Sequence, residues 1–304
     1  MGDEPRVELG VMAPYAPELI TSGPFLRDYA AAIEAVGVES VWAVEHVVVA
    51  EAYEPNYPYS AEGRMPSPRP DAVPMPDPLE LLAFLAACSS TLRLGTAVVV
   101  APLHRAAVLA KRAATLDLLS GGRFLLGLGI GWQKEEYATV GASFERRGLQ
   151  LDECIAAMRS LWGPGPSTFH GETVSFDAVH LVPKPTSGAV PIVLGGNSAP
   201  AVRRAGRVAD GWFPFTLSPD DLADGVEALH AAAREAGRDP GAIAITAWPG
   251  SFDPTLEWDV DWVRRYVDAG ARRLLLSVRI ARPDQLDELT DTIGRYRAEV
   301  LDKL

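Results

Sequence analysis

Short apolar runs recur along the whole chain and are separated by stretches with helical periodicity. Most of these runs are continuously apolar rather than alternating, as expected of parallel strands that are covered on both faces. The pattern predicts eight strands, at Val7–Met12, Ser40–His46, Leu92–Val100, Phe124–Leu128, Pro191–Leu194, Trp212–Phe215, Ile243–Trp248 and Leu274–Val278.

The stretches between these runs have the spacing of amphipathic helices. In one of them, apolar residues from Phe25 to Val36 recur on one helical face, and Gly37 follows at a position typical of a helix end. In another, Ser218 precedes Pro219 and two aspartates, as at a helix N-terminus. Eight strand-then-helix units in series predict an α/β fold, a (β/α)8 TIM barrel.

Two segments interrupt this rhythm. Residues 47–78 follow the second strand and contain eight prolines, so they are much longer than an ordinary strand-to-helix loop and predict a lid. Residues 163–188 form an insertion between the fourth helix and the fifth strand, in which Thr168–Phe176 predicts a small hairpin. We expect residues 1–304 to form a single barrel domain.

Composition narrows the function classes. The 304 residues carry a formal net charge of −12, which disfavours binding to nucleic acid or to an anionic membrane surface. Only Cys88 and Cys154 are present, and no uninterrupted apolar segment is long enough to span a membrane. We expect a cytoplasmic protein with a small-molecule substrate. No metal-binding spacing such as H-E-x-x-H occurs.

Polar residues at the C-terminal ends of the barrel strands are the strongest candidates for site residues, because active sites of such barrels lie there. Glu45 and His46 end the second predicted strand and could contact a polar ring or exchange protons. A buried histidine held by a neighbouring loop is the alternative for this pair. His104, after the third strand, either faces the same site or caps the next helix.

Two glycine-containing segments follow other strands. Gly127-Leu128-Gly129-Ile130-Gly131 does not have the Rossmann spacing, and its glycines either admit a flat ligand or make room for barrel packing. Gly195-Gly196-Asn197-Ser198 precedes a helix that carries Arg203, Arg204 and Arg207. Free N–H groups at a helix N-terminus suit a phosphate, although an ordinary turn capped by Ser198 is the alternative.

Several segments together resemble a known family. They are Leu94–Arg105, Ala110–Arg123, Gly127–Trp132, Glu135–Tyr137, Pro191–Gly196 and Ala209–Trp212. Their order and spacing resemble the bacterial luciferase-like monooxygenase superfamily, most closely its coenzyme F420-dependent oxidoreductases of the actinobacterial type. The resemblance extends over roughly residues 7–280.

This resemblance implies a flavin or deazaflavin in the barrel mouth. The acid–histidine pair that touches the ring corresponds to Glu45 and His46. The non-prolyl cis peptide that bulges behind the ring corresponds to Ala97–Val98, and the turn at Gly195–Ser198 would hold the phosphate side. Sugar-phosphate dehydrogenases of the family have a catalytic glutamate where this chain has Trp132, which argues against that substrate and predicts an apolar contact.

We therefore expect an oxidoreductase that transfers a hydride between coenzyme F420 and a small organic substrate. FMN is the second choice of cofactor, because an FMN-dependent monooxygenase that activates oxygen is an alternative. A barrel that binds a flavin or deazaflavin without turnover is another. The resemblance also implies a homodimer.

Overall fold

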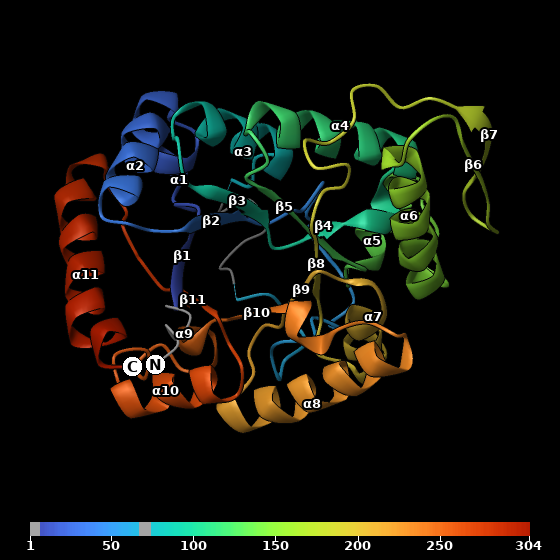
Figure 1. Ribbon diagram of the computed structural model, residues 1–304. Helices are drawn as coiled ribbons and strands as arrows, with labels where there is room; N and C mark the ends of the chain where they lie inside the picture. The colour runs from blue at the N-terminus through green and yellow to red at the C-terminus, as the bar shows by residue number, and fades with distance from the viewer. Residues whose placement is uncertain (1–6, 67–73) are drawn as a thin grey trace.

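The computed structural model describes residues 7–66 and 74–304, and it contains a closed barrel of parallel strands surrounded by helices (Figure 1). The eight predicted strands are all present at or near their expected positions. They are β1 (Glu8–Met12), β2 (Ser40–Ala43), β3 (Arg93–Thr96) with β4 (Val99–Val100), β5 (Phe124–Gly129), β8 (Ile192–Gly195), β9 (Gly211–Phe213), β10 (Ala244–Ala247) and β11 (Arg273–Leu276).

Each barrel strand pairs in parallel with its neighbours in chain order. The sheet runs β3-β2-β1-β11-β10-β9-β8-β5-β4, and an additional pairing of β3 with β5 closes it. The fold is thus the predicted (β/α)8 TIM barrel.

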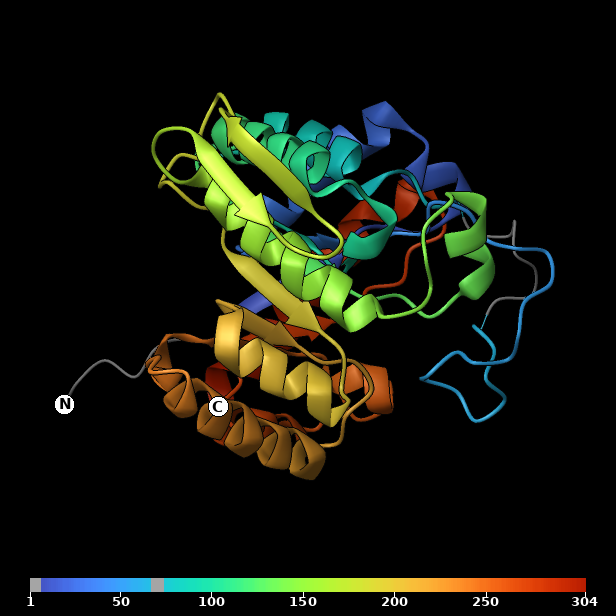
Figure 2. The same ribbon diagram turned by 90° about the vertical axis from the view of Figure 1, so that its right-hand side faces the viewer.

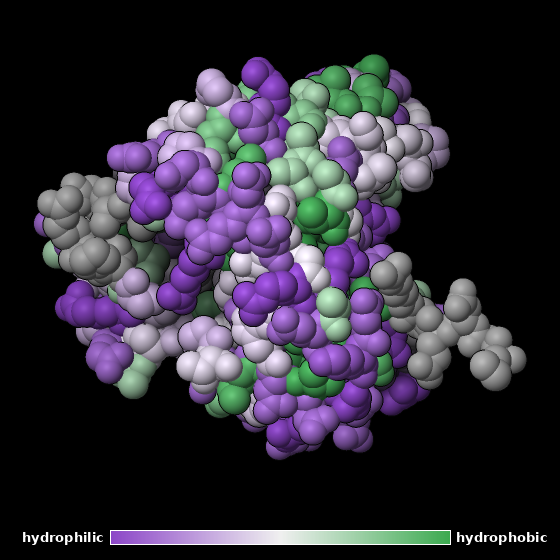
Figure 3. All heavy atoms as spheres, turned by 90° about the vertical axis from the view of Figure 1, so that its left-hand side faces the viewer, coloured by the Kyte–Doolittle hydropathy of each residue, from purple (hydrophilic) through white to green (hydrophobic). Residues whose placement is uncertain are grey.

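Helices cover the outside of the barrel and bury their apolar faces against the strands. The face over α11 and α2 is largely hydrophilic in Figure 3, as the amphipathic spacing of these helices requires. The helices are α1 (Pro17–Ile20), α2 (Gly23–Ala35), α3 (Pro78–Ala87), α4 (Ala106–Leu119), α5 (Lys134–Thr139), α6 (Arg147–Trp162), α7 (Ala199–Val208), α8 (Pro219–Glu235), α9 (Pro249–Phe252), α10 (Val260–Asp268) and α11 (Leu286–Glu299).

Local sequence signals place several helix ends correctly. The hydroxyl of Ser218 accepts a hydrogen bond from the backbone N–H of Asp221 and caps α8, as predicted. Gly37 follows α2 with a φ of 77°, the left-handed conformation expected at a helix end. No helix in the described part of the chain is long and apolar enough to cross a membrane.

The two segments that interrupt the alternation of strands and helices differ in structure. The insertion contains the predicted hairpin, formed by antiparallel β6 (Ser167–His170) and β7 (Ser175–Val179) on the outside of the barrel (Figure 1). The long loop after β2 extends away from the barrel, at the right of Figure 2. Residues 67–73 of this loop, and residues 1–6 of the expected domain, lie outside the described residues.

The prediction of one continuous strand over Leu92–Val100 is wrong, because Ala97 and Val98 separate β3 from β4. The peptide bond between them is cis, as the family resemblance implies. The second strand is also shorter than predicted and ends at Ala43. The backbone N–H of Val44 donates to the hydroxyl of Tyr15, 2.7 Å away, instead of to a neighbouring strand.

An ion-pair cluster around a buried arginine closes the bottom of the barrel. Arg273, at the start of β11, is 4% exposed and binds both carboxylate oxygens of Glu39 at 2.7 Å and Glu8 at 2.8 Å. Above it, Trp42 packs edge-on against Phe213 inside the barrel. Arg273 has a structural role, because carboxylates already pair with its guanidinium. A ligand site is therefore expected at the other end of the barrel, where the strands have their C-terminal ends.

The glycine run of β5 makes room for the break between β3 and β4. A Cβ atom at Gly127 would lie 1.6 Å from the carbonyl oxygen of Thr96, and one at Gly129 would lie 2.6 Å from Val98 Cγ2. Of the two interpretations of this run, barrel packing is therefore the one that the structure supports for these two glycines.

The substitution Gly127→Ala should destabilise the protein by at least about 3 kcal/mol, because backbone atoms of β3 would have to move. Gly294→Ala is a matched control, since Gly294 lies in α11 with no atom within 4 Å of the added Cβ. It should leave stability unchanged or raise it by up to about 1 kcal/mol. Urea unfolding measures both changes, and equal stability of the two variants would contradict the steric argument.

Candidate functional site

A cavity of about 1700 Å³ opens at the C-terminal end of the barrel. All the residues predicted from the sequence as site residues line it. They are Glu45, His46, Ala97, Val98, Trp132, Gly195, Gly196, Asn197 and Ser198. Because these residues come from four different strand ends, barrel closure is what brings them together.

Glu45 is 6% exposed, and both of its carboxylate oxygens have partners. Oε2 accepts the backbone N–H of Val100 at 2.7 Å, and Oε1 lies 2.9 Å from Nε2 of His104. Glu45 thus ties the end of β2 to the segment directly after the cis peptide. His104 does not cap α4, whose N-cap is Arg105, and it is not among the described residues that line the cavity. It binds Glu45 instead.

His46 is held by an acid from a different element. Its Nδ1 lies 3.2 Å from Oε2 of Glu136, whose other oxygen accepts the backbone N–H of Val47 at 2.6 Å. Glu136 is 1% exposed and belongs to α5, just after the glycine run. Sequence reasoning missed Glu136, although Glu135-Glu136-Tyr137 was among the motifs of the resemblance.

The floor of the cavity contains the cis peptide and small residues of the neighbouring strands. A Cβ at Gly195 would lie 3.1 Å from Val98 Cγ1, so β8 approaches the bulge closely. Gly196 has a φ of 96°, a left-handed conformation that favours glycine. The carbonyl of Gly196 accepts the indole N–H of Trp212 at 3.0 Å.

Helix α7 starts beside this turn with an uncapped N-terminus. Ser198 occupies the N-cap position, but its side chain makes no capping hydrogen bond, so the capping alternative is not what the structure shows. The side-chain amide of Asn197 pairs with the backbone of Phe215, donating at 2.5 Å and accepting at 3.2 Å. Asn197 therefore has its backbone N–H and the second hydrogen of its side-chain amide left as donors for an anion.

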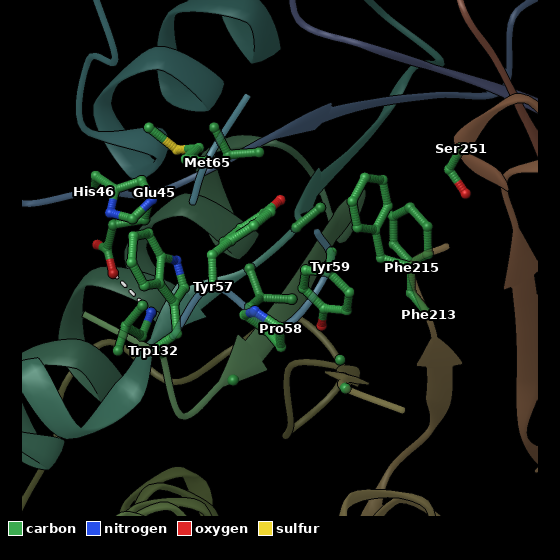
Figure 4. A pocket seen from close by; sticks show the side chains of 18 of the residues that line it. Glu45, His46, Tyr57, Pro58, Tyr59, Met65, Trp132, Phe213, Phe215 and Ser251 are labelled. Carbon is green, nitrogen blue, oxygen red and sulfur yellow. Dashed lines mark hydrogen bonds between the residues drawn. The ribbon is translucent and has the colours of Figure 1, made fainter. Parts of the chain in front are cut away.

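Aromatic side chains of the loop after β2 lie over the mouth of the cavity. In Figure 4, Tyr57, Pro58 and Tyr59 lie between Trp132 and His46 on one side and Phe213 and Phe215 on the other. Ring centroids are 5.2 Å apart for Tyr57 and Trp132, and 5.1 Å apart for Tyr59 and Phe215. Burial, with smaller effects of the neighbouring tyrosines, raises the pKa of Tyr57 to about 12, so its hydroxyl stays protonated at neutral pH.

Comparison with known proteins agrees with this architecture. Residues 7–273 match the family described as luciferase-like monooxygenase. This chain belongs to that family. An uncharacterized protein of Mycobacterium tuberculosis strain H37Rv is 31% identical over 264 residues, which cover 86% of this chain and 88% of the relative.

Two further similarities are to proteins with named activities. A 5,10-methylenetetrahydromethanopterin reductase of Methanolobus tindarius is 29% identical over 233 residues, 76% of this chain and 63% of the reductase. The solved structure of an F420-dependent secondary alcohol dehydrogenase in complex with an F420-acetone adduct has a TM-score of 0.74 at 18% identity. It covers 96% of this chain and 99% of the dehydrogenase chain, a likeness that shows the shared fold.

A third buried acid, Glu257, lies next to Ser277, a residue that lines the cavity. Glu257 is 4% exposed, and its carboxylate accepts the backbone N–H of Ser277 at 3.1 Å. The hydroxyl of Ser277, which lines the cavity, accepts the indole N–H of Trp248 at 2.9 Å. Burial raises the pKa of Glu257, and the hydrogen bonds from Ser277 and the charge of Arg279 oppose this rise only in part.

This shift predicts a pH-dependent stability. A carboxyl whose pKa is raised by folding stabilises the protein below its ordinary pKa, and this contribution is lost as the pH rises through the folded-state pKa. Glu257→Gln should therefore be more stable than the wild type at pH 7, and the difference should vanish near pH 4, at about the ordinary pKa of a glutamate. Urea unfolding between these two pH values measures the effect.

Glu153→Gln is the control of opposite sign. Burial alone would raise the pKa of Glu153, but hydrogen bonds from the hydroxyl and N–H of Thr173 and from the N–H groups of Glu172 and Val174 lower it. Its stabilising contribution is present at neutral pH and lost as the pH falls through the folded-state pKa. The variant should be less stable than the wild type at pH 7. If both variants change stability in the same direction at pH 7, the pKa directions given for Glu257 and Glu153 are wrong.

Proposed function

We propose that this protein is an oxidoreductase that transfers a hydride between coenzyme F420, a deazaflavin, and a small organic substrate. The observation that carries the proposal is the cavity at the barrel mouth, with the Ala97–Val98 bulge at its floor and the N-terminus of α7 at its side. Ligand cavities typically measure about 300–1,000 Å³, so this one has room for a cofactor and a substrate together.

The residues present fit such a cofactor. Val98 faces Gly129 and Gly195, so the bulge presents a smooth apolar wall against which a planar ring would pack. The backbone at Gly195–Ser198 and the first turn of α7 would take the phosphate, because the first N–H groups of a helix have no partner within it. When bound, the deazaflavin supplies the hydride chemistry, and the protein supplies orientation and electrostatics.

His46 is the residue that we assign to proton exchange with the substrate. A carboxylate beside Nδ1 favours the tautomer that carries its proton there, which leaves Nε2 as the acceptor toward the cavity. Glu45 acts on the same site by holding the strand ends on either side of the bulge, since both its oxygens are engaged. Trp132 and the tyrosines of the loop favour an apolar or aromatic substrate.

A flavin-dependent monooxygenase is the second candidate, because the family description itself names monooxygenases. The two functions differ in cofactor, since a deazaflavin reacts poorly with oxygen. A barrel that binds the cofactor without turnover is the third.

Titration of the purified protein with coenzyme F420 and with FMN, followed by fluorescence, tests the proposal. We expect F420 to bind at least tenfold more tightly than FMN, and the reduced form to lose its hydride to some member of a broad panel of apolar carbonyl and enone substrates. Preferential FMN binding with oxygen-dependent product formation would instead support the monooxygenase. Binding of F420 with no hydride transfer across the panel would support the non-catalytic barrel.

Gly196→Asp should weaken cofactor binding at least tenfold, because a carboxylate would face the phosphate. Gly196→Asn imposes the same backbone strain at this left-handed position without the charge, and it should weaken binding clearly less. Titration calorimetry measures both. Unchanged affinity of the aspartate variant would remove this turn from the binding site.

A further inference from the structure

We infer that Arg147 and Arg204 form a second anion subsite, beyond the phosphate turn, for the carboxylates of an acidic cofactor tail. The inference rests on the proposed function, because coenzyme F420 carries glutamate residues beyond its phosphodiester. FMN, by contrast, ends at its phosphate. The subsite would therefore distinguish the two cofactors.

The cavity reaches past the barrel mouth into the space between two helices. Its lining there comes from the beginning of α6 and the beginning of α7, and it includes Phe144, Arg147, Gly148, Ser198, Ala201 and Arg204. The two helices thus form the walls of one end of the cavity, next to the turn at Gly195–Ser198. A ligand whose phosphate lies at this turn has this end as its path outward.

Arg147 has a fixed position and an unneutralised charge. Its guanidinium lies 3.5 Å from the ring centroid of Phe144 and donates from Nη1 to the carbonyl of that residue at 2.9 Å. In residues 7–66 and 74–304 no carboxylate forms an ion pair with Arg147, and its buried Nε has no hydrogen-bond partner. A guanidinium stacked on a ring and left with free donors suits an incoming carboxylate.

Arg204 is held in place from the neighbouring helix. Its side chain is 11% exposed, and Nε and Nη2 donate to Asp152 of α6 at 2.7 Å and 3.2 Å. A Cβ at Gly148 would lie 2.7 Å from Nη2, so the glycine allows the guanidinium to lie against the start of α6. Asp152 uses one edge of the guanidinium, which leaves donors of the other edge for a ligand.

The local charge is positive although the chain has a net charge of −12. Asp152 also lies 4.0 Å from Arg207, so this single acid faces Arg204 and Arg207, while Arg147 adds a third positive charge. The adjacent Arg146 pairs with Glu172 and does not line the cavity. An excess of cations at the end of a cavity in an acidic protein indicates an anionic ligand group.

The position of the arginines favours a tail over the phosphate itself. Arg204 follows the first residue of α7 by five positions, which places its Cα about 7.5 Å along the helix from Ala199. The phosphate would be bound at the helix N-terminus. Groups that extend beyond it would then meet Arg204 and Arg147.

The test measures binding of three probes by fluorescence titration: F420 with its glutamate tail, the same deazaflavin ending before the glutamates, and FMN. We expect the tail to strengthen binding to the wild type about tenfold or more. Arg147→Gln should reduce this advantage to threefold or less, while the affinity for the tail-less deazaflavin stays within twofold of the wild-type value. That second affinity also shows that the variant is folded.

Arg203→Gln is the matched control, because Arg203 lies on α7, is exposed and does not line the cavity. It removes the same charge and should keep the full advantage of the tail. Three outcomes would overturn the inference: no tail advantage in the wild type, an equal loss in Arg203→Gln, or equally weakened binding of the tail-less deazaflavin to Arg147→Gln. If neither deazaflavin binds the wild type, the proposed function itself fails, and this result is distinct from the other three.

Discussion

The close approach of the Thr96 carbonyl and Val98 to β5 is the constraint on which the rest of the site depends. A strand position that leaves 1.6 Å between a Cβ and a carbonyl oxygen admits only glycine, so Gly127 is fixed by the path of β3 rather than by any ligand. Where β3 ends and β4 begins, the backbone turns into the barrel mouth, and Val98 becomes part of the cavity floor. The shape of the cavity is thus set by main-chain packing.

Two buried carboxylates fix this shape from the side of β2. Glu45 and Glu136 each bind one histidine. Glu45 also accepts one backbone N–H and Glu136 two, and each acid joins segments that are far apart in the chain. A buried carboxylate that lost one of these partners would retain an unsatisfied charge, which costs more than the hydrogen bond contributes. The arrangement therefore holds as a unit and positions His46 and the bulge relative to one another.

The sequence predicts the barrel well, and the residues predicted for the site line one cavity, because hydrophobic runs and strand ends are local properties. It predicts the partners of Glu45 and His46 poorly. These two residues are adjacent, yet one binds His104 and the other Glu136, 59 and 90 positions away. Such pairs form only when the barrel closes, and no spacing rule contains them. Likewise, hydrophobicity predicts Leu92–Val100 as one strand, because Ala97 and Val98 at the break are apolar like the buried strand residues on either side of them.

The aromatic contacts of the loop after β2 add a free-energy cost to any binding that separates them. Tyr53 and Tyr57 pack on Trp132, and Tyr59 packs on Phe215, through edge-to-face contacts worth about 0.5–1.5 kcal/mol each. Separating all three would cost roughly 1.5–4.5 kcal/mol, whereas a ligand of micromolar affinity gains about 8 kcal/mol. Binding of a ligand can therefore separate these rings. The measured affinity of a ligand that does so will be lower than its intrinsic affinity, by the free energy needed to separate the rings.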